Sequence, residues 1–593
     1  MACLCRSDSR VGSPCRVTAP LNAATLQAMD VTTLRAVLAE LRPLLLPSRF
    51  EKAQQPTPHS LQLGLRSQQG RHWLEISWLA EAPRLLAIDP PPRLGQGSTL
   101  AQQLQHGLAG LALVALVQDG WERVVDLQFA PRPGEPISRH LIVELMGRHS
   151  NVFLLDGQRR VITLARQVRQ QQSRLRPIGS GDPYGPPPPL QADPPRSDES
   201  LAHWRRRLAL VPVTLQKALQ QAYQGISPAL ALQLAGDQPG EAARLLAMPV
   251  TDLSEEQWAD LWRQWQQWLG ALEQGRFGFA SGGATAYRCW GTAAVPGGLN
   301  RSLAAYYGPL LASQEALRRR QQLEQRLHSA RTRQQLQRDE QQALLDQVAD
   351  SDALQQQADA LLCGAHPSRE QISEAQALYK RARRLRRSVE AIRPRLELHN
   401  RHLERIEASL TFLEQHTEQP GDLLALEQDV EAMLERSGGE RQGRRRRAAT
   451  PEQSATPQPL ELLTPGGLRV QVGRNHRQND WISLRQARRG DIWFHAQECP
   501  GSHVILKGSE APAGEGDLQA AADLAAHFSR ARGNGRVAVV MVPSEQLQRI
   551  AGAGPGTVRH RGGEVLWADP GRAATLLNTP PSPLPSLRAG SAP

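Results

Sequence analysis

The residues best suited to chemistry lie in one stretch, residues 473–507, which combines arginines with amides, aromatic rings and imidazoles. Guanidinium groups bind phosphate oxygens in pairs, and aromatic and imidazole rings stack on unpaired bases. The mixture predicts a surface for bent, partly single-stranded RNA rather than for a regular duplex. An equally good alternative is a charged surface over a core that Trp493 and Phe494 fill. The side chains concerned are Arg474, Asn475, Arg477, Asn479, Trp481, Arg485, Arg488, Arg489, Trp493, Phe494, His495 and His503.

The same stretch offers no complete metal-binding or catalytic set. His495, Cys499 and His503 flank a turn that Pro500 begins, and this turn brings the two histidines near one another. A structural zinc needs four ligands and a catalytic zinc three, and no further cysteine or acidic residue has useful spacing. Ser502 adjoins His503, but neighbours on a strand point to opposite faces, and neither GxSxG nor GxxxxGK[ST] occurs. We therefore expect no metal, no cofactor and no enzyme activity.

The composition of the 593-residue chain favours a polyanionic partner. Lysine and arginine number 70 against 58 aspartate and glutamate, and the net charge of +12 attracts RNA, DNA or an anionic membrane surface. No run of about 18 or more apolar residues occurs, so we expect no membrane span and no membrane partner. The chain exceeds the roughly 250 to 300 residues that one core supports, so several domains are expected. The six cysteines form no disulfide framework, which fits a reducing cytoplasm.

The N-terminal part predicts a leader followed by a strand-rich domain. Residues 1–29 lack the apolar core of a secretory signal and are expected to be disordered or not translated. Residues 30–185 open with an amphipathic helix that Pro47 ends, and short alternating apolar runs follow. Asp156 and Gly157 supply the positive-φ turn of a hairpin. The alternating runs are residues 61–66, 72–80, 123–130, 141–147 and 151–165.

Residues 186–308 predict a linker followed by a helical region. The linker composition, rich in Pro, Gly and Ser, already begins at Arg176. Gly225 ends one helix and Ser227 caps the next, which has Pro228 at its first position, so a helix-hairpin-helix unit is expected. Four tryptophans then share one helical face, and a stripe at that spacing more often fills a core than stacks on bases. They are Trp258, Trp262, Trp265 and Trp268.

Residues 309–436 predict an antiparallel coiled-coil hairpin. Leu, Gln, Arg, Glu and Ala dominate two long runs, a composition typical of helices that pair along a narrow apolar seam. Gly364 and Pro367 lie between the runs and allow the chain to turn back. At a rise of about 1.5 Å per residue, the hairpin extends on the order of tens of ångströms.

A basic linker, residues 437–460, follows the coiled coil. Its block from Arg444 to Arg447 is either a solvated tract or an arm that contacts phosphates. Residues 573–593, rich in Pro, Ser and Ala, predict a disordered tail.

Between these segments, residues 461–572 predict a compact α+β domain. Four apolar segments have the pattern of strands, and Asp517 is expected to cap a helix that Gly533 ends. The strand segments are residues 467–473, 491–496, 502–508 and 536–543. The chain is therefore expected to be a multidomain α+β protein.

Segments at both ends of the chain resemble the RqcH/NEMF family, also called NFACT or fibronectin-binding-protein-A-like. DIWFHAQECPGSHVILK, from Asp491, resembles the D-x-W-F-H-x…P-G-S-H-V signature of the family's RNA-binding module, NFACT-R. SRFEKAQQP, VELMGRHSNVFLLD and SRLRPIGSGDPYGPPPP resemble segments of its N-terminal module, NFACT-N. The helix-hairpin-helix unit, the coiled coil and their order match as well, so the resemblance runs from Asp30 to about residue 570.

This resemblance implies a cytoplasmic ribosome quality-control factor that takes part in the rescue of stalled ribosomes. Members of the family bind the large ribosomal subunit after a stalled ribosome splits, sense the peptidyl-tRNA of the stalled nascent chain and recruit tRNA. In bacteria this is chiefly alanyl-tRNA, and the stalled chain receives a C-terminal alanine tail that marks it for degradation. Peptide bonds form at the ribosomal peptidyl transferase centre, so the resemblance implies RNA binding without catalytic groups.

The resemblance also implies which residues contact RNA. The N-terminal module of the family uses an Asp-Arg pair in handling tRNA, and the matching residues are Glu122 and Arg123, which keep the charges and lengthen the acid by one methylene. Arg148 and His149, within a matched segment, are further expected tRNA contacts. In the C-terminal module the expected RNA contacts are Arg474, Asn475, Asp491, Trp493, His495, Ser502 and His503.

Two alternatives belong to other functional classes. Some relatives are named for fibronectin binding, which suggests a surface adhesin, although the sequence shows no export signal or anchor. The N-terminal module also resembles the formamidopyrimidine-glycosylase fold, which suggests a nucleic-acid-binding repair protein. No residue matches the amino-terminal proline nucleophile of that enzyme, which argues against repair chemistry.

Overall fold

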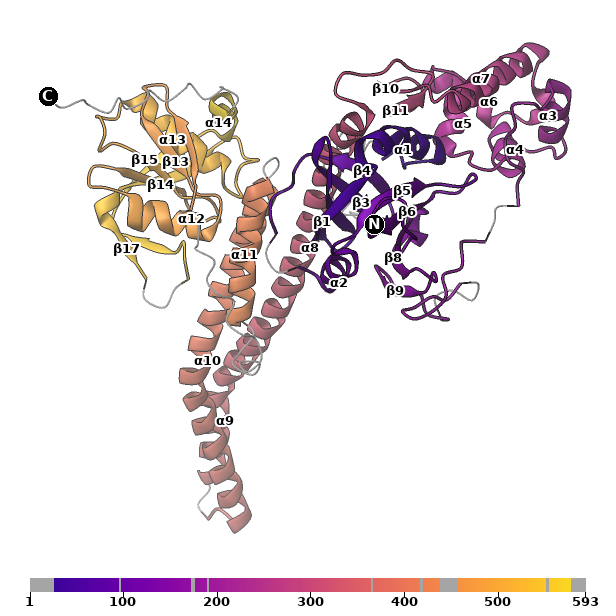
Figure 1. The fold of residues 1–593 in the computed structure, drawn as a ribbon. Coiled ribbons are helices and arrows are strands. Elements are labelled where there is room, and N and C mark those ends of the chain that lie inside the picture. Colours follow the sequence, from indigo (N-terminus) through magenta and orange to yellow (C-terminus); the bar gives the residue numbers. More distant parts are fainter. Residues whose placement is uncertain are drawn as a thin grey trace, which may run out of the picture. The chain divides into compact units, whose positions relative to one another are not determined.

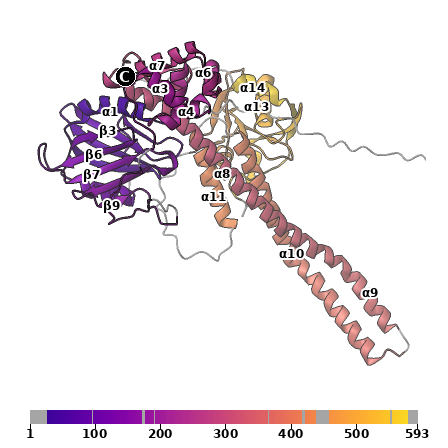
Figure 2. The ribbon, with the colours of Figure 1, turned by 90° about the vertical axis from the view of Figure 1, so that its right-hand side faces the viewer.

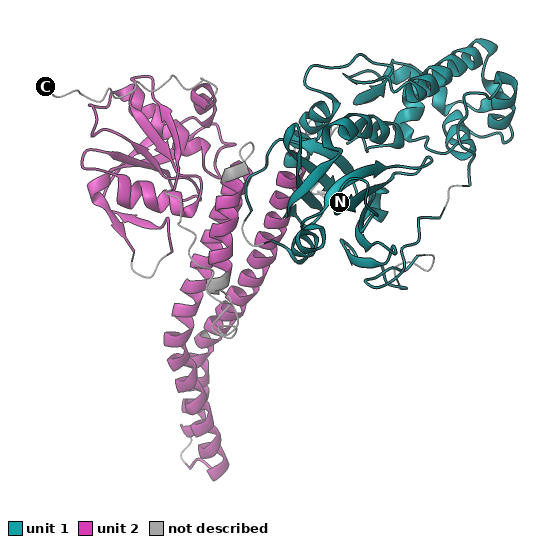
Figure 3. Cartoon of the chain, viewed as in Figure 1, with its two compact units in different colours: residues 1–312 teal, residues 313–593 magenta. Residues whose placement is uncertain are grey.

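The computed structural model describes residues 26–94, 97–171, 176–188, 191–363, 366–415, 420–437, 457–550 and 554–577. The chain divides into two compact units, residues 1–312 and 313–593 (Figure 3). Strand-rich and helical groups of elements follow one another along the chain, which confirms the multidomain α+β class (Figure 1). Gly364, the block from Arg444 to Arg447 and the tail beyond residue 577 lie outside the described residues.

The first unit contains a nine-stranded antiparallel sheet with the order β4-β3-β2-β1-β5-β6-β7-β8-β9. Pairing of β1 with β5 joins two meanders, each made of strands that follow one another along the chain. The strands are β1 Ser48–Thr57, β2 Ser60–Ser67, β3 Gly70–Ser77, β4 Arg84–Ile88, β5 Ala112–Val117, β6 Val124–Ala130, β7 Arg139–Glu144, β8 Asn151–Asp156 and β9 Val161–Leu164.

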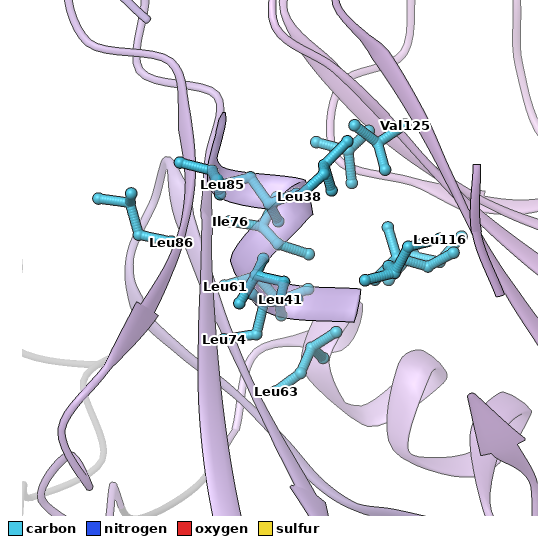
Figure 4. Close-up of a cluster of buried hydrophobic side chains, with 14 of the residues drawn as sticks. Leu38, Leu41, Leu61, Leu63, Leu74, Ile76, Leu85, Leu86, Leu116 and Val125 are labelled. Carbon is cyan, nitrogen blue, oxygen red and sulfur yellow. The ribbon is translucent and has the colours of Figure 1, made fainter. Parts of the chain in front are cut away.

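Helix α1 (Val31–Leu45) lies at the centre of the core of this unit. Asp30 caps its first turn, and its apolar positions are buried, as their spacing predicts. Figure 4 shows Leu38 and Leu41 between the side chains of β2 to β4 and those of β5 and β6. Both halves of the sheet therefore pack against one helix. A second helix, α2 (Thr99–Leu108), packs on β1.

The last residues of the expected leader belong to this core. Met29 is fully buried. The side-chain amide of Gln27 donates to the carbonyl oxygen of Tyr287 at 3.0 Å, and its backbone carbonyl accepts from the Tyr307 hydroxyl at 2.8 Å. The expectation of a leader is therefore wrong for residues 26–29, because their polar groups are paired inside the fold. Residues 1–25 lie outside the described residues.

The turn between β8 and β9 differs from its prediction. The residue with positive φ is Arg159, at 59°, and not Gly157. The Asp156 carboxylate accepts the backbone N–H groups of Gln158 and Arg160 at 2.9 and 2.8 Å. An Asp that hydrogen-bonds the backbone ahead of it stabilises a turn in which a glycine is not needed.

Residues 176–184 pack on the sheet and do not form part of the expected linker. Arg176 pairs with Glu144 at 2.6 Å, the Tyr184 hydroxyl donates to the same carboxylate at 2.8 Å, and Ile178 is buried. Glu144 lies inside the sheet on β7, and a buried carboxylate requires such partners. The polar composition of this segment did not reveal that Arg176 neutralises a buried carboxylate and that Tyr184 donates a hydrogen bond to it.

A helical region completes the first unit. Ser227 accepts the Leu230 N–H at 2.9 Å at the start of α5, as expected for a helix-hairpin-helix unit. The tryptophan stripe of α7 fills the core of this region, where Trp258, Trp265 and Trp268 are buried, so the core interpretation is confirmed. The elements are α3 Leu201–Leu208, α4 Leu215–Ala222, α5 Pro228–Ala235, α6 Pro239–Ala247, α7 Glu255–Glu273, β10 Phe277–Ser281 and β11 Tyr287–Trp290.

Long helices dominate the first part of the second unit. Helix α8 (Leu299–Asp346) begins before the expected start at residue 309, and its residues up to 312 belong to the first unit, where Leu299, Leu303 and Tyr307 are part of the core. After α9 (Asp350–Leu362) the chain turns back, and α10 (Arg369–Gln415) lies beside α9 as a hairpin (Figure 2).

A separate helix, α11 (Pro420–Ser437), packs at the base of this hairpin. It was not distinguished in the sequence, because its composition continues that of the coiled coil. Apolar side chains of three helices meet there, Leu327 from α8, Phe412 from α10 and Leu426 from α11. The base of the hairpin is therefore a small three-helix core.

The C-terminal domain contains a six-stranded sheet with the order β12-β13-β15-β14-β16-β19. Helix α13 covers one face, and α12, a following π-helical turn and the β17–β18 hairpin lie against the other. The elements are β12 Leu460–Leu463, β13 Arg469–Val472, α12 His476–Trp481, the turn Ile482–Gln486, β14 Ile492–Ala496, β15 Val504–Leu506, α13 Glu515–His527, β16 Val537–Pro543, β17 Leu547–Arg549, β18 Val558–His560, β19 Glu564–Ala568 and α14 Pro570–Leu577.

The expected role of Asp517 is wrong in detail. The N-cap of α13 is Gly514, and Asp517 lies at the third helical position, where it accepts the N–H of Gly514 at 3.0 Å. Its carboxylate also accepts the Thr464 hydroxyl at 2.6 Å, so it ties the helix to the preceding strands. The helix ends at His527 rather than near Gly533.

Among the described residues, no helix combines the length and the apolar character that crossing a bilayer requires.

Candidate nucleic-acid interface

The rings of the C-terminal signature line a pocket of about 430 Å³ on one face of the sheet. Trp493 and His495 are two residues apart on β14, so their side chains point to the same face of the sheet. Their rings are parallel, with centroids 5.5 Å apart. His503 meets both rings edge-on, at 5.2 Å from Trp493 and 5.4 Å from His495. His560 of the β17–β18 hairpin lies 5.8 Å from Trp493 and contributes to the wall. The structure therefore brings together three of the residues that the sequence singled out.

Hydrogen bonds fix the position of His503. Its Nδ1 lies 2.8 Å from the Ser483 hydroxyl, and its backbone N–H donates to the side-chain oxygen of Asn479 at 3.0 Å. The indole N–H of Trp493 is buried and has no hydrogen-bond partner within the described part of the chain. A buried donor without a partner lowers the stability of the protein, so a ligand that accepts a hydrogen bond from this indole N–H would be favoured in the pocket.

Two of the imidazoles that line the pocket, those of His495 and His503, are neutral at physiological pH. Burial lowers the pKa of His495 to about 4, although hydrogen bonds to the backbone of Gly501 and Ala496 oppose this effect. Burial also holds the pKa of His503 well below its usual range, and the neighbouring His495 adds to the shift. The pocket therefore presents ring faces and neutral hydrogen-bonding groups, which suit a nucleobase better than a phosphate. The described residues contain no group of three or more His, Cys, Asp or Glu side chains placed to hold a metal ion.

The other four candidate residues of this domain have partners or positions inside the protein. Asn475 caps α12 and accepts the Gln478 N–H at 2.8 Å. Asp491 is fully buried and pairs with Lys507 at 3.0 Å. Ser502 is fully buried, and its hydroxyl has no partner among the described residues. Arg474 is described next, and a direct RNA contact by any of the four stays a prediction.

Arg474 forms an ion pair with a helix of the coiled-coil region. Its Nη2 lies 2.9 Å from a carboxylate oxygen of Asp422 on α11, and only 18% of its side chain is exposed. Arg477 pairs in the same way with Asp429 of α11, at 2.7 Å. Two arginines of the expected RNA surface therefore hold the C-terminal domain against α11. By contrast, Arg485, Arg488 and Arg489 are exposed.

Three histidines whose pKa values are lowered by burial make the stability of the second unit dependent on pH. Burial lowers the pKa of His476 to about 4, as it does for His495, and it holds the pKa of His503 well below its usual range. In the unfolded chain these groups bind protons near pH 6.5, so the unfolded state takes up more protons between about pH 6.5 and 4. The urea midpoint of unfolding, followed by circular dichroism, is therefore expected to fall as the pH decreases through this window.

His476→Gln should reduce this dependence on pH, whereas His328→Gln, at an exposed position of α8, should leave it unchanged. Equal pH profiles for the two variants would show that the buried histidines do not cause the effect.

A second and larger pocket, of about 1020 Å³, lies in the first unit. It opens between the start of α1, the β5–β6 turn, the α4–α5 turn and the β10–β11 turn. Gly225 makes this junction close, because a Cβ there would lie 2.8 Å from the Trp121 ring and 2.9 Å from Val31. Its φ of +76° also favours glycine. The helix-hairpin-helix unit is therefore held directly against the strand-rich part.

Glu122 and Arg123 both line this pocket, at the end of the β5–β6 turn. The Arg123 guanidinium donates to the Met29 carbonyl oxygen at 3.2 Å. Burial lowers the pKa of Arg123, and the charges of Asp30 and Glu122 oppose this effect. Partial desolvation strengthens a hydrogen bond from this guanidinium to a polar group, while the two nearby carboxylates offset its positive charge. Arg148 and His149 are exposed beyond the pocket wall, where Arg148 Nε lies 3.1 Å from His149 Nε2.

Sequence analysis missed Asp30 and Trp121 as pocket residues. The Asp30 carboxylate accepts the Ser227 hydroxyl at 2.9 Å as well as capping α1, so it joins the two walls of the pocket. Trp121 lies 5.5 Å from Trp268, and the Arg35 guanidinium stacks 4.2 Å from its ring centroid. The run Trp121-Glu122-Arg123 was the available signal, since an indole beside the charged pair is unusual in a turn.

Family models match both ends of the chain. The model of the NFACT N-terminal and middle domains matches residues 30–370, and the model of the NFACT protein RNA binding domain matches residues 462–562. The first match alone covers more than half of the chain, and the second contains the ring-lined pocket. The chain therefore belongs to the NFACT family of RqcH-like proteins, and it carries the RNA-binding domain of that family.

Two sequence relatives agree with this assignment. The Rqc2 homologue RqcH of Streptococcus suis is 26% identical over 575 residues, which cover 92% of this chain and 98% of that protein. RqcH of Bacillus subtilis is 36% identical over 104 residues, or 18% of each chain. The solved N-terminal part of the fibronectin/fibrinogen-binding protein from Streptococcus suis is 22% identical, with a TM-score of 0.37, over 47% of this chain and 99% of that one.

Proposed function

We propose that this protein is a cytoplasmic ribosome quality-control factor that binds the obstructed large ribosomal subunit and tRNA and promotes alanine tailing of stalled nascent chains. The observation that carries the proposal is the match to RqcH proteins over 92% of the chain, which includes both RNA-related modules in order. The net charge of +12 supports a polyanionic partner, and the ring-lined pocket suits an unpaired base of a nucleic acid.

Each part has a distinct task in this proposal. The pocket around Glu122 and Arg123 binds tRNA, and its size suits a single-stranded end rather than a helix. The hairpin of α9 and α10 carries exposed basic residues between Lys380 and Arg395, which contact phosphates of ribosomal RNA. The C-terminal domain binds unpaired nucleotides. The protein positions RNA and supplies no catalytic group, so peptide bonds form at the ribosome.

Sequencing of the RNA that co-purifies with the protein tests this proposal. We expect tRNA, with alanine tRNA enriched, together with RNA of the large subunit, relative to a mock purification. A repair protein would bring DNA instead, and an adhesin would bring neither nucleic acid above the mock level. Either of those results would contradict the proposal.

A further inference from the structure

An exposed tryptophan lies on the same face of the C-terminal sheet as the ring-lined pocket. Trp567 of β19 is 62% exposed, and its neighbour on that face, Val565, is 48% exposed. Neither residue belongs to the signature segment, and neither was among the candidate contacts. The exposed indole and the exposed valine are neighbours on one face of the strand, so together they form a small apolar patch.

Strand register places Trp567 beside the pocket. On β16, Val540 pairs with His495 of β14 on one side and with Val565 of β19 on the other. One step along this face, Ala538 pairs with Trp567. The side chains of paired residues point to the same face of a sheet. The side chains of His495, Val540, Val565, Ala538 and Trp567 therefore all lie on one face of the sheet, and they connect the pocket to Trp567.

The separation suits two bases of one strand. Neighbouring strands lie about 4.8 Å apart, so β19 is roughly 10 Å from β14, and one step along the face adds about 7 Å. The other side of β19 faces the core, where Leu566 and Ala568 pack against α13. Only the face with Val565 and Trp567 is open to a ligand.

Positive charge lies close to this face. Arg536, just before β16, and Arg561, just before the loop that enters β19, are exposed. Within the described part of the chain, neither arginine has an ion-pair partner. Exposed guanidinium groups beside stacking rings are the combination that binds single-stranded nucleic acid without sequence preference.

The edge position of β19 could also suit a peptide that adds as a further strand. Backbone groups at this edge are partly occupied, however, because Gln519 Nε2 donates to the Trp567 carbonyl oxygen at 3.1 Å and Asp523 accepts the Asp569 N–H at 2.8 Å. The occupied edge and the exposed indole favour a ligand that binds to the side chains. A nucleobase does so, whereas an added strand needs the backbone.

We propose that the open face of this sheet is a track for single-stranded RNA, in which one unpaired base enters the pocket of Trp493, His495 and His503 and a nearby base of the same strand stacks on Trp567. This inference rests on the RNA binding proposed above for the same domain. It adds a second stacking position and predicts a preference for single strands over duplexes.

The test compares full-length variants in binding to a fluorescein-labelled oligouridylate and to the same strand annealed to oligoadenylate. Trp567→Ala should weaken binding of the single strand about 5- to 100-fold, which is the effect of losing one stacked base. Trp567→Phe keeps a ring and should recover most of the affinity. Leu463→Ala, at the opposite edge of the same sheet and 41% exposed, is the matched control and should bind like wild type. The salt dependence should not change, because no charge is lost.

Photo-cross-linking gives a second readout. An oligouridylate that carries 4-thiouridine should cross-link to the peptide containing Trp567, which mass spectrometry of the digested complex identifies. Circular dichroism and thermal unfolding confirm that the variants are folded, which is expected because Trp567 is exposed.

The failures are distinguishable. Wild-type affinity of Trp567→Ala for the single strand, or cross-links confined to other peptides, overturns the track and leaves the proposed function standing. Binding of wild type to the duplex but not to the single strand does the same. Loss of ribosome co-sedimentation by Trp567→Ala without loss of RNA affinity points to a protein contact and overturns the RNA assignment. Absence of any RNA binding by wild type contradicts both the track and the proposed function.

Discussion

Arg123→Ala is expected to abolish alanine tailing in cells while leaving the fold intact. The guanidinium is partly desolvated in the larger pocket, beside Asp30 and Glu122, and it donates a hydrogen bond to the Met29 carbonyl oxygen. A charge-assisted hydrogen bond to a bound ligand contributes about 1.5 to 3 kcal/mol, so its loss weakens productive binding about 10- to 100-fold. Immunoblots of a stalled reporter chain, with mass spectrometry of its C-terminus, measure the tails.

Two variants sharpen this experiment. Arg159→Ala removes an exposed arginine from the β8–β9 turn of the same unit and should leave tail length unchanged. Glu122→Asp keeps the carboxylate and shortens the side chain by one methylene, to the acid that the family resemblance implies, and should support tailing at least as well as the native residue. If cells that express Arg123→Ala at the native protein level still make tails of normal length, the assignment of this pocket to tRNA binding is contradicted.

Removal of the outer part of the hairpin is expected to release the protein from large ribosomal subunits. Arg386 Nε lies 3.3 Å from the Ser351 hydroxyl, so the two helices are adjacent there and a short glycine linker can rejoin them. Deletion of residues 353–384 removes Lys380, Arg381, Arg383 and Arg384, all exposed. Each lost phosphate contact lowers the salt slope by about 0.7 to 0.9, so co-sedimentation at moderate salt should fall at least tenfold.

This deletion keeps the three-helix core at the base, including Leu327, Phe412 and Leu426, so both flanking domains should remain folded. A second variant keeps both helices at full length and replaces Arg381, Arg383, Arg384 and Arg387 by Gln. It distinguishes the effect of the positive charges from the effect of the length of the hairpin. Co-sedimentation of the shortened protein at the native level would show that the hairpin does not anchor it.

Local patterns predicted the regular elements of the fold well. The spacing of Leu34 to Leu45 predicted α1, and short apolar segments predicted β14 and β16. Helix α2 was missed, although Ser98 caps it and Ala101, Leu104 and Leu108 are its buried residues. Its glutamines obscured that narrow stripe. Strand β19 was missed because its short apolar run has an exposed face.

The candidate site was predictable only in part. Spacing and the turn at Pro500 placed His495 and His503 together, since both flank the same strand connection. The partners of Arg474 and Arg477 were not predictable, because α11 is far away in the sequence and its docking depends on the whole second unit. Asp491 matches the family signature, but its carboxylate is buried and pairs with Lys507. A residue of such a signature can therefore stabilise the domain instead of contacting a ligand.

The ion pair between Arg474 and Asp422 makes RNA binding at that arginine an exchange of anions. A phosphate that reaches Arg474 must displace a carboxylate, and the freed Asp422 then repels the incoming backbone or recruits a cation. Uptake of that cation offsets one of the counterions that the RNA releases. The slope of log affinity against log salt would then indicate fewer phosphate contacts than the protein makes. Asp422→Asn removes the competing carboxylate, so this variant should show a steeper slope.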